Sequence, residues 1–513
     1  MMQRYLAMGF IWAGGAIFAQ TTVEPLSAID WLSQSVQVPV VASQVAPHAI
    51  SEPPIANSAA TPTITVTPLD APSPDPIGLL SPEVTGLPQS LWAASDQDTV
   101  VTLVRAERFD SLPAIQEFMV ILMLAEADAP RDASTDGALF LSRVDKLLDY
   151  GAIEPARALL EQADPEEPSL FRRWFDIALL TGSEDAACEA MQSNPQLAPT
   201  FSARIFCLAR SGDWNTAALT LNTHRVLGDV SEEDEALLSR FLDPELYEGE
   251  GKLPNPSRIS PLVFRMREAI GEGLTTQNLP RAFAHADLRD TVGWKSQLEA
   301  AERLARYGAV SDNVLAGFYA DHTPSASGGV WDRVEAVQKF AVALKTRDPG
   351  AISASLPAAW IAARASKTEI PFARLFAEDL QCLPLTDEAS DVAFVVGLLS
   401  PSYESFALAA SDGRDPFLVA VARGFADEAT ATTTLSRAIR DGFGETQAPA
   451  VLAALLDEGK LGEALLRNIA LFDAGMSGDS RAISESLALF RLVGLEDVAR
   501  RAALQLLLLE RAS

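Results

Sequence analysis

Apolar residues recur at helical spacing along most of the chain. Phe118 and Leu122 continue one apolar face, and Val144 and Leu148 line another. Spacings of three and four residues place side chains on the same face of an α-helix. Short loops with Pro, Gly or Asp separate these segments, and sustained two-residue alternation is missing after about residue 96. The pattern therefore predicts an all-α body of about two dozen short helices.

Two sets of three glycines stand at near-constant spacing, with apolar residues before each glycine and an alanine five positions after it. The first set is Gly151, Gly182 and Gly212, followed by Ala156, Ala187 and Ala217; the second is Gly424, Gly459 and Gly494, followed by Ala429, Ala464 and Ala499. Glycine readily takes the positive φ that ends a helix, and a small alanine lets the next helix cross closely. Each unit is predicted to be a helical hairpin.

This pattern resembles the tetratricopeptide repeat, whose unit is about 34 residues. The nearest matches are Arg210-Ser-Gly-Asp-Trp-Asn-Thr-Ala-Ala218 and Leu455-Leu-Asp-Glu-Gly-Lys-Leu-Gly-Glu-Ala464. The resemblance covers about residues 137–228 and 410–511, and the family's early tryptophan and closing proline are missing. It implies an α-solenoid of stacked helical hairpins and carries over no peptide-binding residues.

An N-terminal arm differs in composition from this body. No Lys or Arg stands between Arg4 and Arg105, and prolines interrupt the candidate helices and strands between residues 39 and 88. The arm is predicted to be a disordered, Pro-rich and acidic segment. The chain divides into a signal peptide, the arm, a first repeat region, an irregular helical middle and a C-terminal repeat region, at residues 1–19, 20–95, 96–244, 245–410 and 411–513.

Two apolar islands interrupt the arm. The first carries Ile29, Trp31, Leu32 and Val36 near helical spacing, and the second covers residues 77–92. Apolar islands in disordered arms commonly dock on another surface. We expect the second island to pack on its own body and the first to be a docking segment for a partner. Packing of the first island on its own body is the alternative.

The first nineteen residues predict export. Arg4 supplies a positive end, Tyr5 to Phe18 form an uncharged and mostly apolar run, and Ala19 offers a small residue for cleavage before Gln20. The run is short for a membrane span, which needs about 20 apolar residues. We expect a periplasmic protein without a membrane span after cleavage; an uncleaved anchor is the alternative.

The net charge of the chain limits the classes of molecule that it is expected to bind. The 513 residues include 69 acidic residues against 40 Lys and Arg, a net charge of −29. Such a balance argues against nucleic-acid phosphate as a partner. Stacked helical hairpins form large surfaces suited to proteins. We therefore expect a periplasmic scaffold or adaptor that binds protein partners of unknown identity.

Binding of glycan or peptidoglycan is the alternative. A lytic cell-wall enzyme is the least expected reading, because the second repeat set continues to the last residues and Glu485-Ser486 falls inside a predicted helix. The segment Phe171-Arg172-Arg173-Trp174-Phe175 is basic and aromatic, so it could contact an acidic partner or a glycan, although Phe175 also fits a core position.

Catalytic, cofactor and metal motifs are missing from the sequence. The chain has four histidines, and only His285 has a carboxylate close by in sequence, at Asp287. That pair is expected on a surface helix. No Cys or His pairs have zinc-ligand spacing, and no glycine-rich loop fits a phosphate. We predict no catalytic residues, no cofactor and no metal ion.

The repeat register brings two cysteines together. Cys188 falls on the second helix of one hairpin and Cys207 on the first helix of the next, and these helices are neighbours in a stacked array. An oxidising compartment would keep a disulfide between them. The third cysteine, Cys382, is expected to be a buried thiol.

Overall fold

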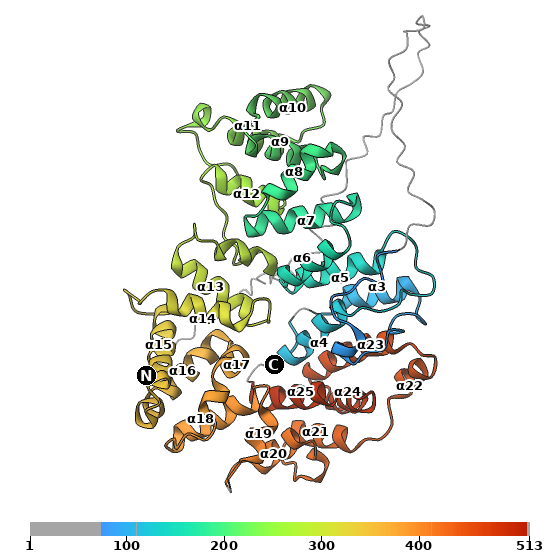
Figure 1. Ribbon diagram of the computed structural model, residues 1–513, viewed down its shortest axis with the longest axis vertical. Coiled ribbons are helices and arrows are strands. Elements are labelled where there is room, and N and C mark those ends of the chain that lie inside the picture. The colour runs from blue at the N-terminus through green and yellow to red at the C-terminus, as the bar shows by residue number, and fades with distance from the viewer. Residues whose placement is uncertain (1–72, 109, 412, 510–513) are drawn as a thin grey trace, which may run out of the picture.

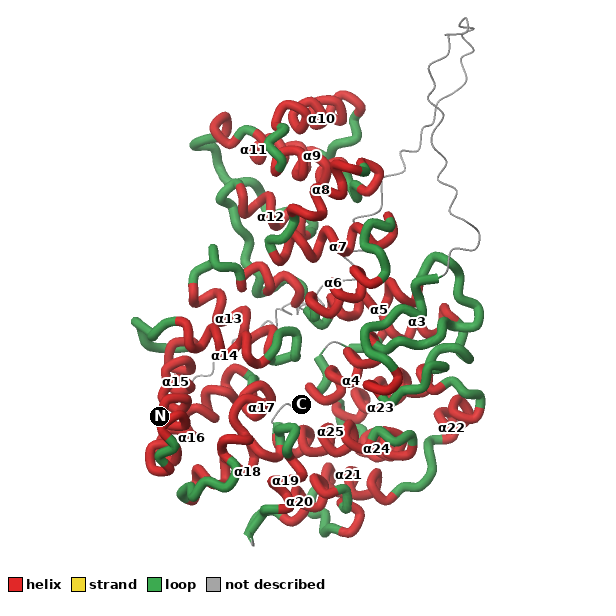
Figure 2. The backbone as a smooth tube through the Cα atoms, in the orientation of Figure 1, coloured by secondary structure: helices red, strands yellow, loops and turns green. Residues whose placement is uncertain are grey.

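The structure, a computed structural model, describes residues 73–108, 110–411 and 413–509 (Figures 1 and 2), and across these ranges it contains helices and no β-strand. The predicted all-α class is confirmed. The α-helices are α2 (Pro82–Thr85), α3 (Gln97–Ala106), α4 (Pro113–Leu124), α5 (Ala138–Asp149), α6 (Ile153–Gln162), α7 (Pro168–Thr181), α8 (Asp185–Ser193), α9 (Phe201–Arg210), α10 (Trp214–Leu227), α11 (Glu232–Leu242), α12 (Pro261–Ala269), α13 (Trp294–Ala305), α14 (Asp312–Asp321), α15 (Val330–Thr346), α16 (Pro349–Ser366), α17 (Glu369–Leu380), α18 (Asp387–Leu398), α19 (Tyr403–Leu408), α20 (Pro416–Arg423), α21 (Thr434–Gly444), α22 (Ala450–Asp457), α23 (Leu461–Met476), α24 (Ser480–Leu492) and α25 (Glu496–Leu508). The 3₁₀ helices are η1 (Pro195–Leu197), η2 (Pro244–Tyr247), η3 (Arg281–Leu288) and η4 (Ala426–Glu428).

The signal segment 1–19 and the first island, with Ile29, Trp31, Leu32 and Val36, lie outside the described residues. Predictions about them stay predictions. Among the helices within the described ranges, none combines the length and the apolar character that crossing a bilayer requires.

The glycine register places hairpin turns correctly in the first repeat region. Gly151, Gly182 and Gly212 have φ of +77°, +75° and +85°, and each stands between two helices. The alanines five positions later, Ala156, Ala187 and Ala217, are all 0% exposed. The pairs α5–α6, α7–α8 and α9–α10 are therefore hairpins closed by close helix packing, as the register predicts.

The second repeat region follows the same rule with one exception. Gly459 and Gly494 turn between α22–α23 and α24–α25, and the alanines after them are fully buried. After Gly424, however, the chain forms only the 3₁₀ turn η4, and Ala429 is extended and half-buried. The predicted helix is wrong there because a threonine-rich run follows, and β-branched residues and hydroxyl caps disfavour a helix interior. Thr433 instead caps α21.

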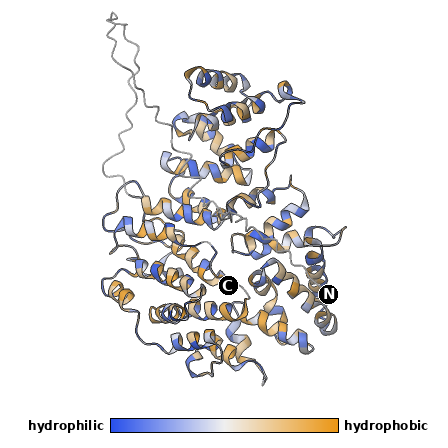
Figure 3. Ribbon diagram, turned by 180° about the vertical axis from the view of Figure 1, so that it is seen from behind, coloured by the Kyte–Doolittle hydropathy of each residue, from blue (hydrophilic) through white to orange (hydrophobic). Residues whose placement is uncertain are grey.

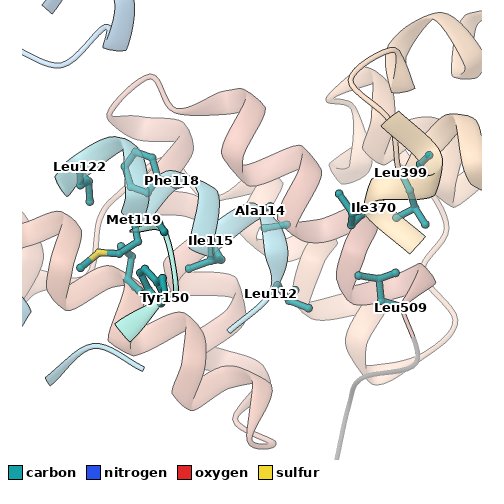
Figure 4. Close-up of a cluster of buried hydrophobic side chains, with 14 of the residues drawn as sticks. Leu112, Ala114, Ile115, Phe118, Met119, Leu122, Tyr150, Ile370, Leu399 and Leu509 are labelled. Atoms are coloured by element: carbon teal, nitrogen blue, oxygen red, sulfur yellow. The ribbon is translucent and has the colours of Figure 1, made fainter. Parts of the chain in front are cut away.

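The first and last parts of the chain pack against each other. Helix α3 contacts α23, and α4 contacts α25, so the blue and red ends of the ribbon lie side by side in Figure 1. Helix α4 is central to the shared core, where Phe118 meets Phe490 of α24 edge to face at 5.7 Å. Figure 4 shows Ala114, Ile115 and neighbouring apolar side chains of this core. The helical chain therefore closes on itself.

The second island belongs to the body. Trp92 is fully buried against Gly462 of α23, where a Cβ atom would lie 2.4 Å from the indole, and the Gly462 amide donates to the Leu91 carbonyl at 3.0 Å. The amides of Leu79 and Leu80 donate to the Leu124 carbonyl. The arm boundary predicted near residue 95 is too late, because residues 73–95 have apolar side chains and backbone partners on the body.

Helices α7–α12 share a hydrophobic core that is separate from the main one, and α8–α11 form the lobe at the top of Figure 1. Helix α12 then returns the chain to α7. Within the lobe, Cys188 of α8 and Cys207 of α9 form a disulfide, with their Cα atoms 5.1 Å apart. Figure 3 shows hydrophobic and hydrophilic residues side by side on most helices, as amphipathic packing requires.

Reducing this disulfide is expected to destabilise the lobe. Cys188 and Cys207 are separated by 19 residues, and the chain-entropy model gives a loop of this length about 3 kcal/mol. Non-reducing peptide mapping should return the linked pair, and thermal unfolding should shift downward when a reductant is added. Free thiols at both positions in the native protein would contradict the bond.

Cys382 is exposed, so the prediction of a buried thiol is wrong. It lies two residues after the end of α17, in a turn where its φ is +65°. It supplies the internal control for the mapping experiment, because a thiol reagent should label it in the native protein.

Candidate functional site

An apolar groove lies between α14, α15 and α17, beside the end of α16. Its volume is about 210 Å³. Its lining residues are Leu315, Ala316, Tyr319 and Ala320 from α14, Val337, Gln338, Ala341 and Lys345 from α15, Ala363 and Thr368 beside the end of α16, and Phe372, Leu375 and Phe376 from α17. Several lining positions are alanines, whose small side chains leave the groove open. It is the most apolar hollow among those described here.

Three phenylalanine rings of α15 and α17 pack against one another at the groove. The ring centroids of Phe340 and Phe372 are 5.5 Å apart, and Phe376 lies 5.2 Å and 4.8 Å from these two rings. Such edge and offset contacts stabilise a fixed arrangement of rings. The wall formed by α15 and α17 is therefore preformed.

The polar groups of the groove wall are hydrogen-bonded within the protein. The Tyr319 hydroxyl donates to Glu302 at 2.8 Å, and Gln338 donates its amide to the carbonyls of Tyr319 and His322, both at 2.7 Å. Burial raises the pKa of Tyr319 well above its ordinary value, so the phenol stays protonated. The wall around Tyr319 and Gln338 therefore offers apolar contact, because its polar groups are already hydrogen-bonded.

One edge of the groove is positively charged. Lys339 pairs with Glu335 at 2.6 Å, whereas Lys345 and Arg347 make no ion pair within the part of the chain that the structure describes. Lys345 lines the groove, and Arg347 follows it two residues later, in a chain whose net charge is −29. The groove thus combines an apolar floor with a cationic edge, which suits an apolar segment bearing a carboxylate.

A larger polar cleft of about 740 Å³ adjoins the groove, and Leu375 lines both. The start of α14 contributes Asp312 to the cleft, and burial raises the pKa of this carboxyl. Arg374 contributes a guanidinium that donates to Glu117 of α4 at 2.6 Å. Arg501 of α25 donates to the same carboxylate. These two ion pairs of Glu117 therefore link α4, α17 and α25.

His285 lines the cleft but is not a surface residue, so that prediction is wrong. It lies on η3, is buried, and its Nε2 atom is 2.7 Å from the Gly151 carbonyl. Burial lowers its pKa to about 4, so the ring is neutral near pH 7 and donates to that carbonyl. Asp287 accepts from Thr276 instead of pairing with the ring. His285 therefore stabilises the hairpin turn.

The basic and aromatic segment at residues 171–175 is largely internal. Phe171 and Phe175 are buried, and Arg173 pairs with Asp145 at 2.6 Å. The two phenylalanine rings therefore belong to the core that α7 shares with α8–α12, and the ion pair of Arg173 joins α7 to α5. In the described part of the chain, no cluster of three or more His, Cys, Asp or Glu side chains could hold a metal ion.

Sequence reasoning missed the groove because its walls come from different helices, α14 to α17, and the way these helices pack is a tertiary outcome. Two signals pointed to it. Val337, Ala341 and Lys345 are four residues apart on one helix face, and cations gather from Lys339 to Lys367 in an acidic chain. Comparisons with protein-family models, with curated proteins and with solved structures found no match to this chain.

Proposed function

We propose that this protein is an exported helical-repeat scaffold that binds protein partners and catalyses no reaction. The observation that carries the proposal is the apolar groove with its cationic edge at Lys345. A groove of about 210 Å³ is smaller than the roughly 300–1,000 Å³ typical of small-molecule pockets. It suits one or two side chains of a polypeptide that lies across it, the mode in which an amphipathic segment fills a hydrophobic groove.

Export is part of the same proposal. The apolar run that follows Arg4 supports a signal peptide, and the disulfide between Cys188 and Cys207 is the kind of bond that oxidising compartments such as the periplasm maintain. The tetratricopeptide-like hairpins supply a large surface on which further contacts with a partner can form.

Glycan binding is the second candidate, and the polar cleft beside the groove favours it. Glu154, Asn313 and Arg374 line that cleft and offer hydrogen-bond acceptors and donors in a volume of about 740 Å³. Retention of the protein on purified peptidoglycan, lost on substitution of Asn313 by Leu and kept on substitution at the groove, would establish this function in place of the first.

A charge reversal at the groove is the experiment that tests partner binding. Lys345→Glu places an anion at the groove edge and is expected to reduce partner recovery at least tenfold when the tagged full-length protein is isolated from a periplasmic extract. Lys339→Glu is the matched control, because this exposed residue is on the same helix outside the groove and its ion pair with Glu335 contributes little stability. Equal recovery of the same partners by both variants would contradict the proposed site.

A further inference from the structure

The arm carries a segment whose chemistry matches the groove. Residues 27–36 contain Ile29, Trp31, Leu32 and Val36 with Asp30 among them. Between residues 20 and 72 the arm has acidic residues and no Lys or Arg. The groove is apolar, and Lys345 at its edge makes no ion pair with described residues. It therefore suits an apolar segment that has a carboxylate beside its largest side chain.

The charge around this groove differs from that of the chain as a whole. The body as a whole is acidic, so most of it repels an arm of the same sign. The helices around the groove, residues 312–380, have seven Lys and Arg against eight Asp and Glu, so they are closer to neutral than the whole chain, and Lys345 itself lines the hollow. The cations at Lys345 and Arg347 make no ion pair with described residues, so they are available to a carboxylate from the arm.

The tether is long enough to reach the groove. Residues 37–72 separate the segment from the point where the described body begins, and an extended chain of this length spans up to about 120 Å. A compact body of about 440 residues has a radius of gyration of only roughly 22 Å. Because the segment and the groove belong to one chain, the segment has an effective concentration near the millimolar range at the groove.

We propose that residues 27–36 bind in the groove between α14, α15 and α17 of their own chain, with Trp31 in the apolar hollow and Asp30 beside Lys345. This inference rests on the proposed function of the groove as a protein-binding site. The arm is then an internal competitor: a partner must match the chemistry of the segment and displace it. Access to the scaffold is governed by the arm.

Photo-crosslinking in the exported full-length protein tests the proposal. A diazirine amino acid is placed at Ala341, which lines the groove, and in a separate protein at Val342, which is 63% exposed and is not among the lining residues. Illumination from position 341 should join the peptide containing residues 27–36, and illumination from position 342 should not. Mixing isotopically light and heavy copies distinguishes a link within one chain from a link between two copies.

Two variants confirm that the link depends on the proposed contacts. Trp31→Ala lies outside the described body and Lys345→Glu is at its surface; each should reduce the yield at position 341 at least fivefold, while Lys339→Glu leaves it unchanged. Links only between heavy and light copies, or only to another protein, would overturn the intramolecular proposal while leaving protein binding at the groove standing. Absence of any link at position 341 would overturn both.

Discussion

Replacing Arg143 by methionine is expected to lower the free energy of unfolding by about 3–5 kcal/mol, because a buried network would lose its only cation. Arg143 on α5 is 0% exposed. Its guanidinium donates to the carbonyls of Asp75 and Ile77 at 3.0 and 2.8 Å, and to those of Met123 and Ala125 at 2.8 and 2.9 Å. Each carbonyl left without a donor costs about 1–3 kcal/mol.

The expected loss has a local signature. Two of these carbonyls belong to the segment that precedes α2, so Arg143→Met should release residues 73–95 to limited proteolysis before the rest of the body unfolds. Urea denaturation supplies the free energy, and Arg105→Met is the control, since this exposed residue at the end of α3 should change stability by no more than about 0.5 kcal/mol. A loss below about 1 kcal/mol for Arg143→Met would show that the network is not needed.

The second large effect is a pH dependence at the contact between the first and last helices. Glu107 follows α3 and is buried, and its Oε2 atom has no hydrogen-bond partner among described residues. Burial, together with the negative charge of Asp473 of α23, raises its pKa to about 8, and Lys146 opposes the rise. Asp473 is itself buried, and burial raises its pKa as well.

The sign follows from proton binding. The unfolded chain releases the Glu107 proton near pH 4.5, whereas the folded protein retains it to about pH 8, so stability is lost as the pH rises between these values. A tenfold change in proton binding corresponds to about 1.4 kcal/mol. Glu107→Gln keeps the neutral form and is expected to be more stable than the wild type by roughly 2–4 kcal/mol at pH 8.5, and about equal to it at pH 4.

Urea unfolding of both proteins across this range checks the prediction, with exposed Glu126→Gln as the matched control. The curves of the wild type and Glu126→Gln should fall together as the pH rises, and the curve of Glu107→Gln should fall less. Parallel curves for all three proteins would mean that Glu107 is not held in its acid form by the fold.

Local patterns predicted the helices and hairpin turns because both depend on neighbouring residues. Gly151 has a positive φ and Ala156 is buried because of steric requirements within one hairpin turn. These requirements can be read from the six residues 151–156. The helix expected after Gly424 failed because the threonines that follow outweigh the repeat register. The apolar residues of the second island predicted that it packs on the body, but not where, because its position depends on Arg143 and on a glycine of α23 hundreds of residues away.

The sequence predicted less of the candidate site than of the fold. The proposed docking segment can be recognised in the sequence as an apolar island in the arm, but the groove forms only where α14, α15 and α17 pack together. Periodicity assigned Phe340, Phe372 and Phe376 only to helix faces, and their packing into one wall is a tertiary outcome.

The affinity of the groove for residues 27–36 tests most directly whether this segment binds there. A fluorescent peptide of residues 24–40 is titrated with the full-length Trp31→Ala protein, whose own segment has lost its largest side chain, and anisotropy gives the dissociation constant. The account predicts saturable binding that Lys345→Glu weakens at least tenfold and Lys339→Glu leaves unchanged, with weaker binding to the wild type because its arm competes. Absence of saturable binding, or equal affinity for both charge-reversed proteins, would contradict the account.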